Sequence, residues 1–248
     1  MTKVNESGHA KNVANFQELV NSVVAFGTRY VPSRESIMLP ALQKILTDAK
    51  QSIADYNVVL SPYKIAVVER ETAFNPLNKL TTRLLNSLKA TDTTAQMDET
   101  AQTLARKIKG ERASAIRAVT SPAEGETTVP DTKQISAAQT SFDNRLDNFD
   151  KLIIHLVNIP QFKPNEEELK PAVLRAYYDE LADKNKKANL AGLALSNARI
   201  ARDKILYEPL TGLTDIAFDT KVYIKSAFGA ISPEYKQVAG IDFKTVKS

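Results

Sequence analysis

The stretch LQKILTDAKQSIADYNVVLSPYKIAVVERETAFNPLNKLTTRLLNSL, residues 42–88, carries the pattern that specifies the fold. Alternating steps of four and three residues from its first leucine meet fourteen positions, and twelve of them are apolar. They are Leu42, Leu46, Ala49, Ile53, Tyr56, Leu60, Tyr63, Val67, Arg70, Phe74, Leu77, Thr81, Leu84 and Leu88. A spacing of about 3.5 residues is typical of a helix packed lengthwise against its partners. The stretch therefore predicts a long helix with one apolar seam.

Two prolines, Pro62 and Pro76, fall inside this pattern without changing its phase. A loop usually resets the phase, so we favour one long, proline-kinked helix over residues 34–89. The alternative is that Ser61 caps a new helix that has Pro62 at its first position.

The same pattern returns 132 or 133 residues later. Matching pairs include Leu42 with Leu174, Ala49 with Leu181, Arg70 with Arg202, Pro76 with Pro209, Thr81 with Thr214, and Asn15-Phe16 with Asn148-Phe149. The pairs include both polar exceptions to the apolar seam, which two unrelated helical patterns would share only by chance. We therefore predict an internal duplication.

These observations predict an all-α fold, an elongated antiparallel helical bundle with long, proline-kinked helices and an internal duplication. We expect a single domain over residues 1–248, made of repeat 1 (14–90), a helical hairpin insert (91–147), repeat 2 (148–230) and a short C-terminal helix with a tail (231–248). The insert includes a loop, Ser121–Asp131, that we expect to be mobile because it is rich in Pro, Gly and Thr. Ser33 and Asn165 are expected to cap the two long helices.

The composition supports long helices, since only 8 glycines occur in 248 residues. Cysteine is absent, so neither disulfides nor thiolate chemistry are available. We see neither a signal peptide nor an apolar stretch long enough for a membrane span, and we expect a cytoplasmic protein. The net charge of +4 is compatible with an anionic partner, but acidic and basic residues are mixed along the chain.

No cluster of side chains suggests catalysis. The two histidines, His9 and His155, are far apart in the sequence, and we interpret His155 as a packed or surface residue of a helix. Asp143, Asp147 and Asp150 share one helix face, which we interpret as a solvated face rather than a cation site. We expect no enzyme activity, no cofactor and no metal site.

Charged residues stand out in two places. Arg70 and Arg202 replace apolar residues at equivalent seam positions, and a charge near a core needs a partner. We predict that each arginine pairs with a carboxylate or caps carbonyls on a neighbouring helix, and so sets the register. A basic run consists of Arg106, Lys107, Lys109, Arg112 and Arg117. Nucleic acid or acidic lipid could dock there, but the residues spread around the helix and we favour a solubilising role.

Three further stretches carry a family resemblance: SFDNRLDNFDKL (141–152), LSNARIARD (195–203) and LYEPLTGL (206–213). They resemble an uncharacterised bacterial family of all-helical proteins with no known function, over nearly the whole chain. The resemblance implies a helical fold and a bacterial origin, and it transfers no mechanism.

The leading functional hypothesis is a non-enzymatic helical interaction or scaffold protein that binds a protein partner or itself. One alternative is a membrane-active component of an α-helical pore-forming system, which would meet the membrane only after a conformational change. Another is weak nucleic-acid binding through the run from Arg106 to Arg117.

Overall fold

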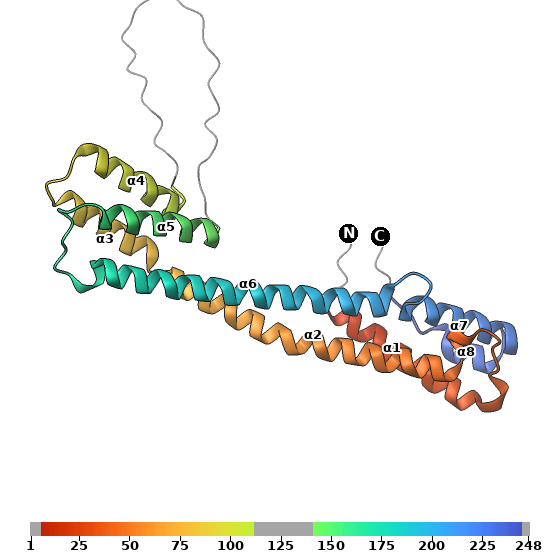
Figure 1. Cartoon of the computed structure of the whole chain (residues 1–248). Helices are drawn as coiled ribbons and strands as arrows, with labels where there is room; N and C mark the ends of the chain where they lie inside the picture. Colours follow the sequence, from red (N-terminus) through yellow and green to blue (C-terminus); the bar gives the residue numbers. More distant parts are fainter. Residues whose placement is uncertain (1–5, 112–140, 245–248) are drawn as a thin grey trace, which may run out of the picture. The chain divides into compact units, whose positions relative to one another are not determined.

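The computed structural model describes residues 6–111 and 141–244, and within these ranges every regular element is helical. The α-helices are α1 (Glu6–Phe26), α2 (Leu39–Phe74), α3 (Leu77–Lys89), α4 (Ala95–Lys109), α5 (Phe142–Val157), α6 (Pro171–Tyr207), α7 (Leu213–Phe228) and α8 (Pro233–Ala239), as Figure 1 shows. Short 3-10 turns are η1 (Gly27–Arg29), η2 (Glu35–Ile37) and η3 (Glu167–Leu169). The predicted all-α class is confirmed, whereas the predicted loop Ser121–Asp131 lies outside the described residues.

The two prolines of the long seam behave differently. Helix α2 continues through Pro62, so Ser61 does not begin a new helix. It ends at Phe74, and α3 begins at Leu77 after a two-residue turn that contains Pro76. The prediction of one helix past Pro76 is therefore wrong. Proline has no N–H to donate and its ring crowds the preceding turn of a helix, so it destabilises a helix interior. At Pro76 the chain leaves the helix, which avoids this destabilisation.

A short corner precedes each long helix. The chain first makes the 3-10 turn η2 or η3, and the long helix then begins at Leu39 or at Pro171. The long helices begin six residues after Ser33 and Asn165, so the prediction that these two residues cap them is wrong. The 3-10 turns have Arg34 and Glu166 at their N-cap positions, and neither makes a side-chain cap bond. A proline within the first turn has no N–H to satisfy, which reduces the need for a side-chain cap.

The chain divides into two compact units. The terminal unit comprises Met1–Lys64 and Leu190–Ser248, and the central unit comprises Ile65–Asn189. Because α2 and α6 each contribute to both units, each unit takes elements from both predicted repeats. The domain boundaries drawn from the repeat stay a prediction.

The terminal unit is built from α1, the first part of α2, the last part of α6, α7 and α8. Helix α1 packs against α7 and α8, which also contact each other. Its core contains fully buried side chains from α1, α2, α6 and α7, including Phe16, Leu19, Leu42, Leu206 and Leu213. Removing this much apolar surface from water is the main stabilising term of the unit.

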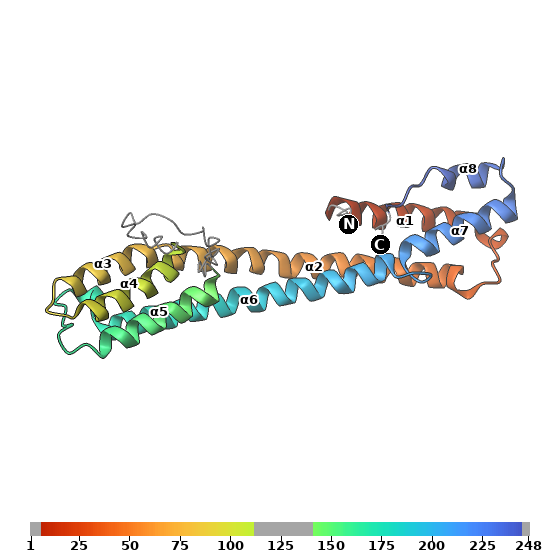
Figure 2. The same ribbon diagram turned by 90° about the horizontal axis from the view of Figure 1, so that it is seen from above.

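The central unit is built from the last part of α2, α3, α4, α5 and the first part of α6. Helix α5 lies beside α4, and α4 beside α3 (Figures 1 and 2). Phe149 of α5 is fully buried and its ring meets that of Tyr177 edge-on at 5.9 Å. Phe74, Leu84 and Leu181 complete the same core from α2, α3 and α6.

The two halves of the chain present matching elements in the same order. Helices α1, α2 and α3 correspond to α5, α6 and α7, and η2 corresponds to η3. Glu35 and Glu167 begin the 3-10 turns 132 positions apart, and Leu39 and Pro171 begin the long helices at the same separation. Phe16 and Phe149, which the predicted repeat pairs, are both fully buried, one in each unit.

Candidate interaction surface

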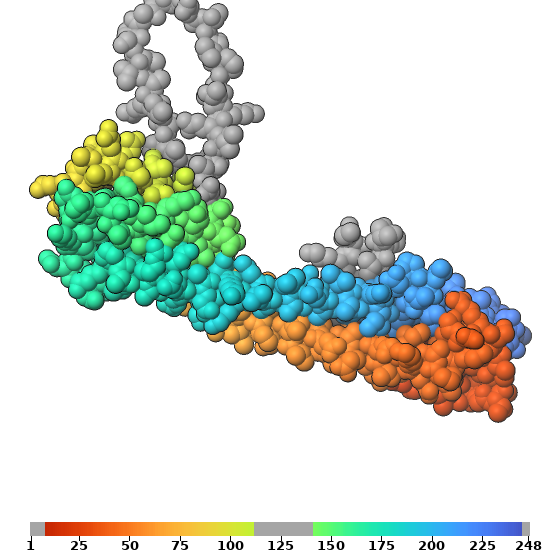
Figure 3. All heavy atoms as spheres, viewed as in Figure 1, coloured from red at the N-terminus to blue at the C-terminus, as the bar shows by residue number. Residues whose placement is uncertain are grey.

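Helix α6 carries a row of exposed apolar side chains in the terminal unit. Leu190, Leu193 and Ile200 are 56%, 58% and 65% exposed, and Asn197 in the same row is also exposed. Steps of three and four residues place these four side chains within an arc of about 80° on the helix. In Figure 3 this part of α6 (light blue) lies at the surface. We call these four residues the α6 stripe.

The α6 stripe faces away from the core. Leu195 and Leu206 belong to the buried seam of the same helix, and the stripe is displaced from that seam by two residues, or about 160°. Helix α6 is therefore packed on one side and presents apolar side chains on the other. Scattered apolar residues are normal on a surface, but a contiguous row at helical spacing is typical of a docking face.

Equivalent positions on α2 show the same property. Val58 and Val68, each 132 residues before a member of the α6 stripe, are 71% and 60% exposed. Val58 belongs to the terminal unit and Val68 to the central unit. Ile65, which corresponds to Asn197, is likewise exposed. The sequence pattern of the buried seam did not reveal these rows, because they share its period and differ only in phase.

Arg70 lies half-buried in the central unit. Its Nη1 donates to the Oδ1 atoms of Asn185 and Asn189 at 3.3 and 3.2 Å, and its guanidinium carbon lies 4.1 Å from the centre of the Phe142 ring. Its Nε is buried without a hydrogen-bond partner among the described residues. The hydrogen-bond partners are thus asparagine amides instead of the predicted carboxylate or carbonyls. Asn185 in turn donates to Asp143 at 2.6 Å, so Arg70 is connected to a carboxylate only through Asn185.

The kind of contact predicted for Arg70, with a backbone carbonyl of a neighbouring helix, is made in the same unit by Arg145, which the sequence pattern did not single out. Its Nε donates to the carbonyl oxygen of Ile108 at the end of α4 (3.1 Å), and its Nη2 donates to Asn78 Oδ1 (3.0 Å). Burial lowers the pKa of this guanidinium from its ordinary value. Arg145 precedes a core residue, Leu146, and its own position gives no periodic signal.

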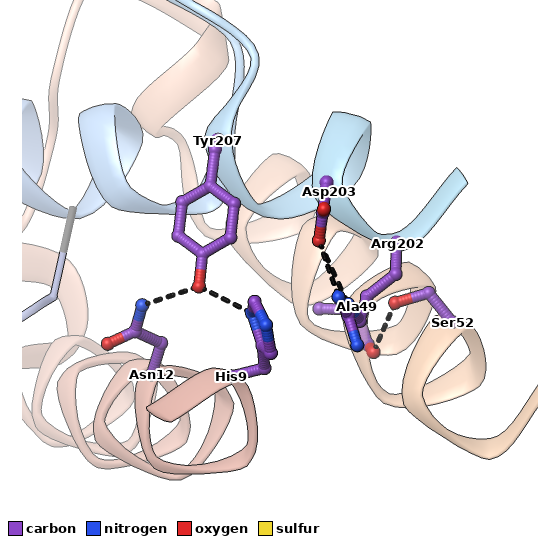
Figure 4. Close-up of polar contacts among 7 residues, drawn as sticks. All are labelled: His9, Asn12, Ala49, Ser52, Arg202, Asp203 and Tyr207. Carbon is purple, nitrogen blue, oxygen red and sulfur yellow. Dashed lines mark hydrogen bonds and ion pairs between the residues drawn. The ribbon is translucent and has the colours of Figure 1, made fainter. Parts of the chain in front are cut away.

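Arg202 is buried in the terminal unit. Figure 4 shows it beside Asp203. It pairs with Asp203, its neighbour on α6, at 2.9 Å, and its guanidinium carbon lies 4.8 Å from the centre of the Tyr56 ring of α2. A carboxylate is therefore present, but on the same helix. The contact with α2 is made through an aromatic face, which attracts a cation.

A buried polar cluster in the terminal unit was missed by the sequence analysis. Tyr207 Oη lies 2.8 Å from His9 Nδ1 and accepts a hydrogen bond from Asn12 Nδ2 at 3.2 Å (Figure 4). Asn12 also exchanges hydrogen bonds with the backbone of Lys244, through its Nδ2 at 2.8 Å and its Oδ1 at 2.9 Å. The cluster ties α1 to the end of α6 and to the C-terminal segment. His9 stands in a polar segment, where no sequence signal indicated its burial.

The described part of the basic run lies in the last turn of α4. Arg106, Lys107 and Lys109 are half-buried, Arg106 donates to Thr103 Oγ1 at 2.9 Å, and Lys109 Nζ lies 3.9 Å from Glu111. Cations are favoured at a helix C-terminus, where the backbone dipole is negative. Arg112 and Arg117 lie outside the described residues.

The three aspartates of α5 are engaged within the protein. Asp147 pairs with Lys151 at 2.5 Å, Asp150 pairs with Arg175, and Asp143 accepts from Asn185. Over residues 6–111 and 141–244, no three His, Cys, Asp or Glu side chains are grouped so that they could hold a metal ion. No helix in these ranges combines the length and apolar character needed to cross a membrane.

Comparison with known proteins adds no further guide to the site. No family model, curated protein or solved structure matches this chain.

Proposed function

We propose that this chain is a non-enzymatic helical interaction protein that uses the α6 stripe to bind another helix. The supporting observation is the row formed by Leu190, Leu193 and Ile200, which are apolar, exposed and aligned on one face. Covering such a row removes apolar surface from water, at roughly 25 cal/mol per Å².

The order of residues in the stripe favours a second copy of the chain as the partner. Leu190, Leu193, Asn197 and Ile200 follow the three-and-four spacing of a coiled-coil seam, with the asparagine at an a-type position. A single asparagine at such a position pairs best with another asparagine, and it fixes register at a cost in stability. We therefore propose a weak self-association in which the two Asn197 side chains meet.

Sedimentation velocity over a hundredfold range of protein concentration tests this proposal. The native chain is expected to shift from monomer towards dimer, and Leu193→Glu is expected to remain monomeric. Phe218→Glu is the matched control, since Phe218 is equally exposed in the same unit but lies on α7. Asn197→Leu is expected to associate more tightly and with a less uniform number of copies.

Two outcomes would overturn the proposal. One is a native chain that stays monomeric throughout the concentration range and that binds no added helical partner through the α6 stripe. The other is an equal loss of association in the stripe variant and in the α7 control.

We also infer that the chain arose by duplication of one helical repeat, and that the two repeats exchange elements, so that each compact unit contains parts of both. The support comes from the matching order of elements and from the composition of each unit, which draws on both repeats. A protease site inserted at Gly125, between the repeats, provides the test. After cleavage the fragments are expected to stay together until denatured, and two separated, folded fragments would contradict the exchange.

A further inference from the structure

A pocket of about 510 Å³ opens within the central unit, between the start of α3, η3 and the first turns of α6. Leu80, Val173 and Leu174 provide apolar walls. The charged residues around it are Lys79 and Arg83 from α3, Glu168 from η3 and Glu180 from α6. Pockets that bind small molecules are commonly of this size and combine apolar walls with a few polar groups.

The corresponding place in the terminal unit holds a smaller pocket of about 220 Å³, lined in part by Ile45 and Asp48, the counterparts of Tyr177 and Glu180. By the repeat, Leu80 corresponds to Leu213 and Arg83 to Ile216, and both counterparts are fully buried. There η2 packs against α7, and Arg34 of the same corner pairs with Asp219 of α7. In the central unit a charged residue, Arg83, stands where isoleucine fills the terminal unit.

The counterpart of Glu168 supports the same contrast. Ser36 occupies the equivalent position in η2, and its hydroxyl oxygen is buried without a hydrogen-bond partner in the described part of the chain. Glu168 is largely exposed and pairs with Arg83 across the pocket. The central unit therefore has a larger pocket, with the ion pair of Arg83 and Glu168 at its edge, where the terminal unit has a smaller one.

One cation at the pocket is free for a ligand. Arg83 is engaged with Glu168, and the Tyr177 hydroxyl donates to the carbonyl oxygen of Ala73 at 2.6 Å. Burial raises the pKa of Tyr177 to about 12, so the phenol stays neutral and supplies no charge. Lys79 is exposed and makes no ion pair or hydrogen bond with any residue that the structure describes. A ligand with one negative group and an apolar body complements this arrangement.

We propose that this pocket binds a small amphipathic carboxylate, with its apolar body against Leu80, Val173 and Leu174 and its carboxylate at Lys79. Glu180 repels an anion, so it favours the orientation in which the carboxylate lies at the α3 side. The proposal is independent of the α6 stripe, which belongs to the other unit.

Isothermal titration calorimetry of the full chain with octanoate tests the proposal, with octylammonium and 1-octanol as probes of the same chain length. Octanoate is expected to bind at one site, and octylammonium at least about tenfold more weakly because its charge is repelled by Lys79. Equal binding of the anionic and cationic probes would overturn the assignment of the carboxylate.

Substitutions locate the site. Lys79→Gln is expected to weaken octanoate binding by about fivefold and Glu180→Gln to strengthen it, while neither changes the binding of 1-octanol. Ala176→Trp, on the pocket wall, is expected to abolish binding of all three probes, whereas Ala194→Trp, exposed on the part of α6 that belongs to the terminal unit, is expected to preserve it.

Each of these results has a contrary outcome. Octanoate binding that survives Ala176→Trp, or that changes in the same direction in Lys79→Gln and Glu180→Gln, would refute the proposed site. The two charge variants keep the test decisive even where the tryptophan variant unfolds. Leu193→Glu, which changes the α6 stripe, is expected to bind octanoate normally, so failure of the self-association proposal is distinguishable from failure of this one.

Discussion

Replacement of Arg70 by leucine tests whether a charge on the seam of α2 stabilises the central unit. The change removes two hydrogen bonds, to Asn185 and Asn189, whose lengths of 3.3 and 3.2 Å place each at the weak end, about 0.5 kcal/mol. It also removes the cation–π contact with Phe142 at 4.1 Å, which contributes about 1 kcal/mol at a half-buried site.

Two effects act in the opposite direction. Leucine removes the buried, unpaired Nε of Arg70, and it adds apolar burial of about 1 kcal/mol. However, it leaves the buried Asn185 without this donor to its Oδ1, at a cost of about 1 kcal/mol or more. The net expectation is a loss of about 1–2 kcal/mol in the free energy of unfolding.

Urea denaturation followed by far-ultraviolet circular dichroism measures this loss. With an m value of about 2 kcal/mol/M, the midpoint is expected to fall by about 0.5–1 M. Lys64→Leu, at an exposed position of the same helix, is the control and is expected to shift the midpoint little. An unchanged or raised midpoint for Arg70→Leu, with an unchanged oligomeric state, would refute a stabilising, register-setting role for this arginine.

Three further predictions concern the backbone and the pH dependence of stability. Leu210 has φ of 69°, a left-handed conformation that costs a non-glycine residue about 1 kcal/mol, so Leu210→Gly is expected to raise the thermal midpoint. Gly212→Ala would place a Cβ 2.6 Å from the backbone nitrogen of Glu208, so we expect a loss of about 1–3 kcal/mol in urea denaturation, and an unchanged midpoint would contradict this close approach. Burial raises the pKa of Tyr30 and Tyr177 to about 12 from 10.0, so the folded state holds these protons more tightly than the unfolded state. The resulting stability is complete below about pH 10 and is lost as the pH rises towards 12, which urea midpoints and tyrosinate absorbance over this range will show.

Local periodicity accounts for the features that the sequence predicted correctly. The seam from Leu42 to Phe74 specified a long helix because side chains three and four residues apart share a helix face whatever lies opposite them. The starts of the two long helices, which were predicted from Ser33 and Asn165 as capping residues, were placed six residues too early. A 3-10 turn and a side-chain cap satisfy similar backbone groups, and the local sequence favours both.

The candidate sites depended on contacts that no local pattern encodes. His9 and Tyr207 lie 198 positions apart and meet only because α1 packs near the end of α6. Arg70 was identified as an exception to the seam, but its partners on α6 followed from packing. The α6 stripe could not be recognised from the sequence, because it has the same period as the buried seam. Only the exposure of the side chains in the structure distinguishes the two rows.

The amino-acid sequence alone was sufficient for the helical class, for the seam of each long helix and for the prediction that the chain repeats itself. Tertiary structure decided which half of each long helix joins which unit, that α2 continues through Pro62 but ends before Pro76, and that the two units have pockets of different size at corresponding places. The physical reason is range: helix formation depends on neighbours within about four residues, whereas burial, pairing of charges and open space depend on residues brought together from distant parts of the chain.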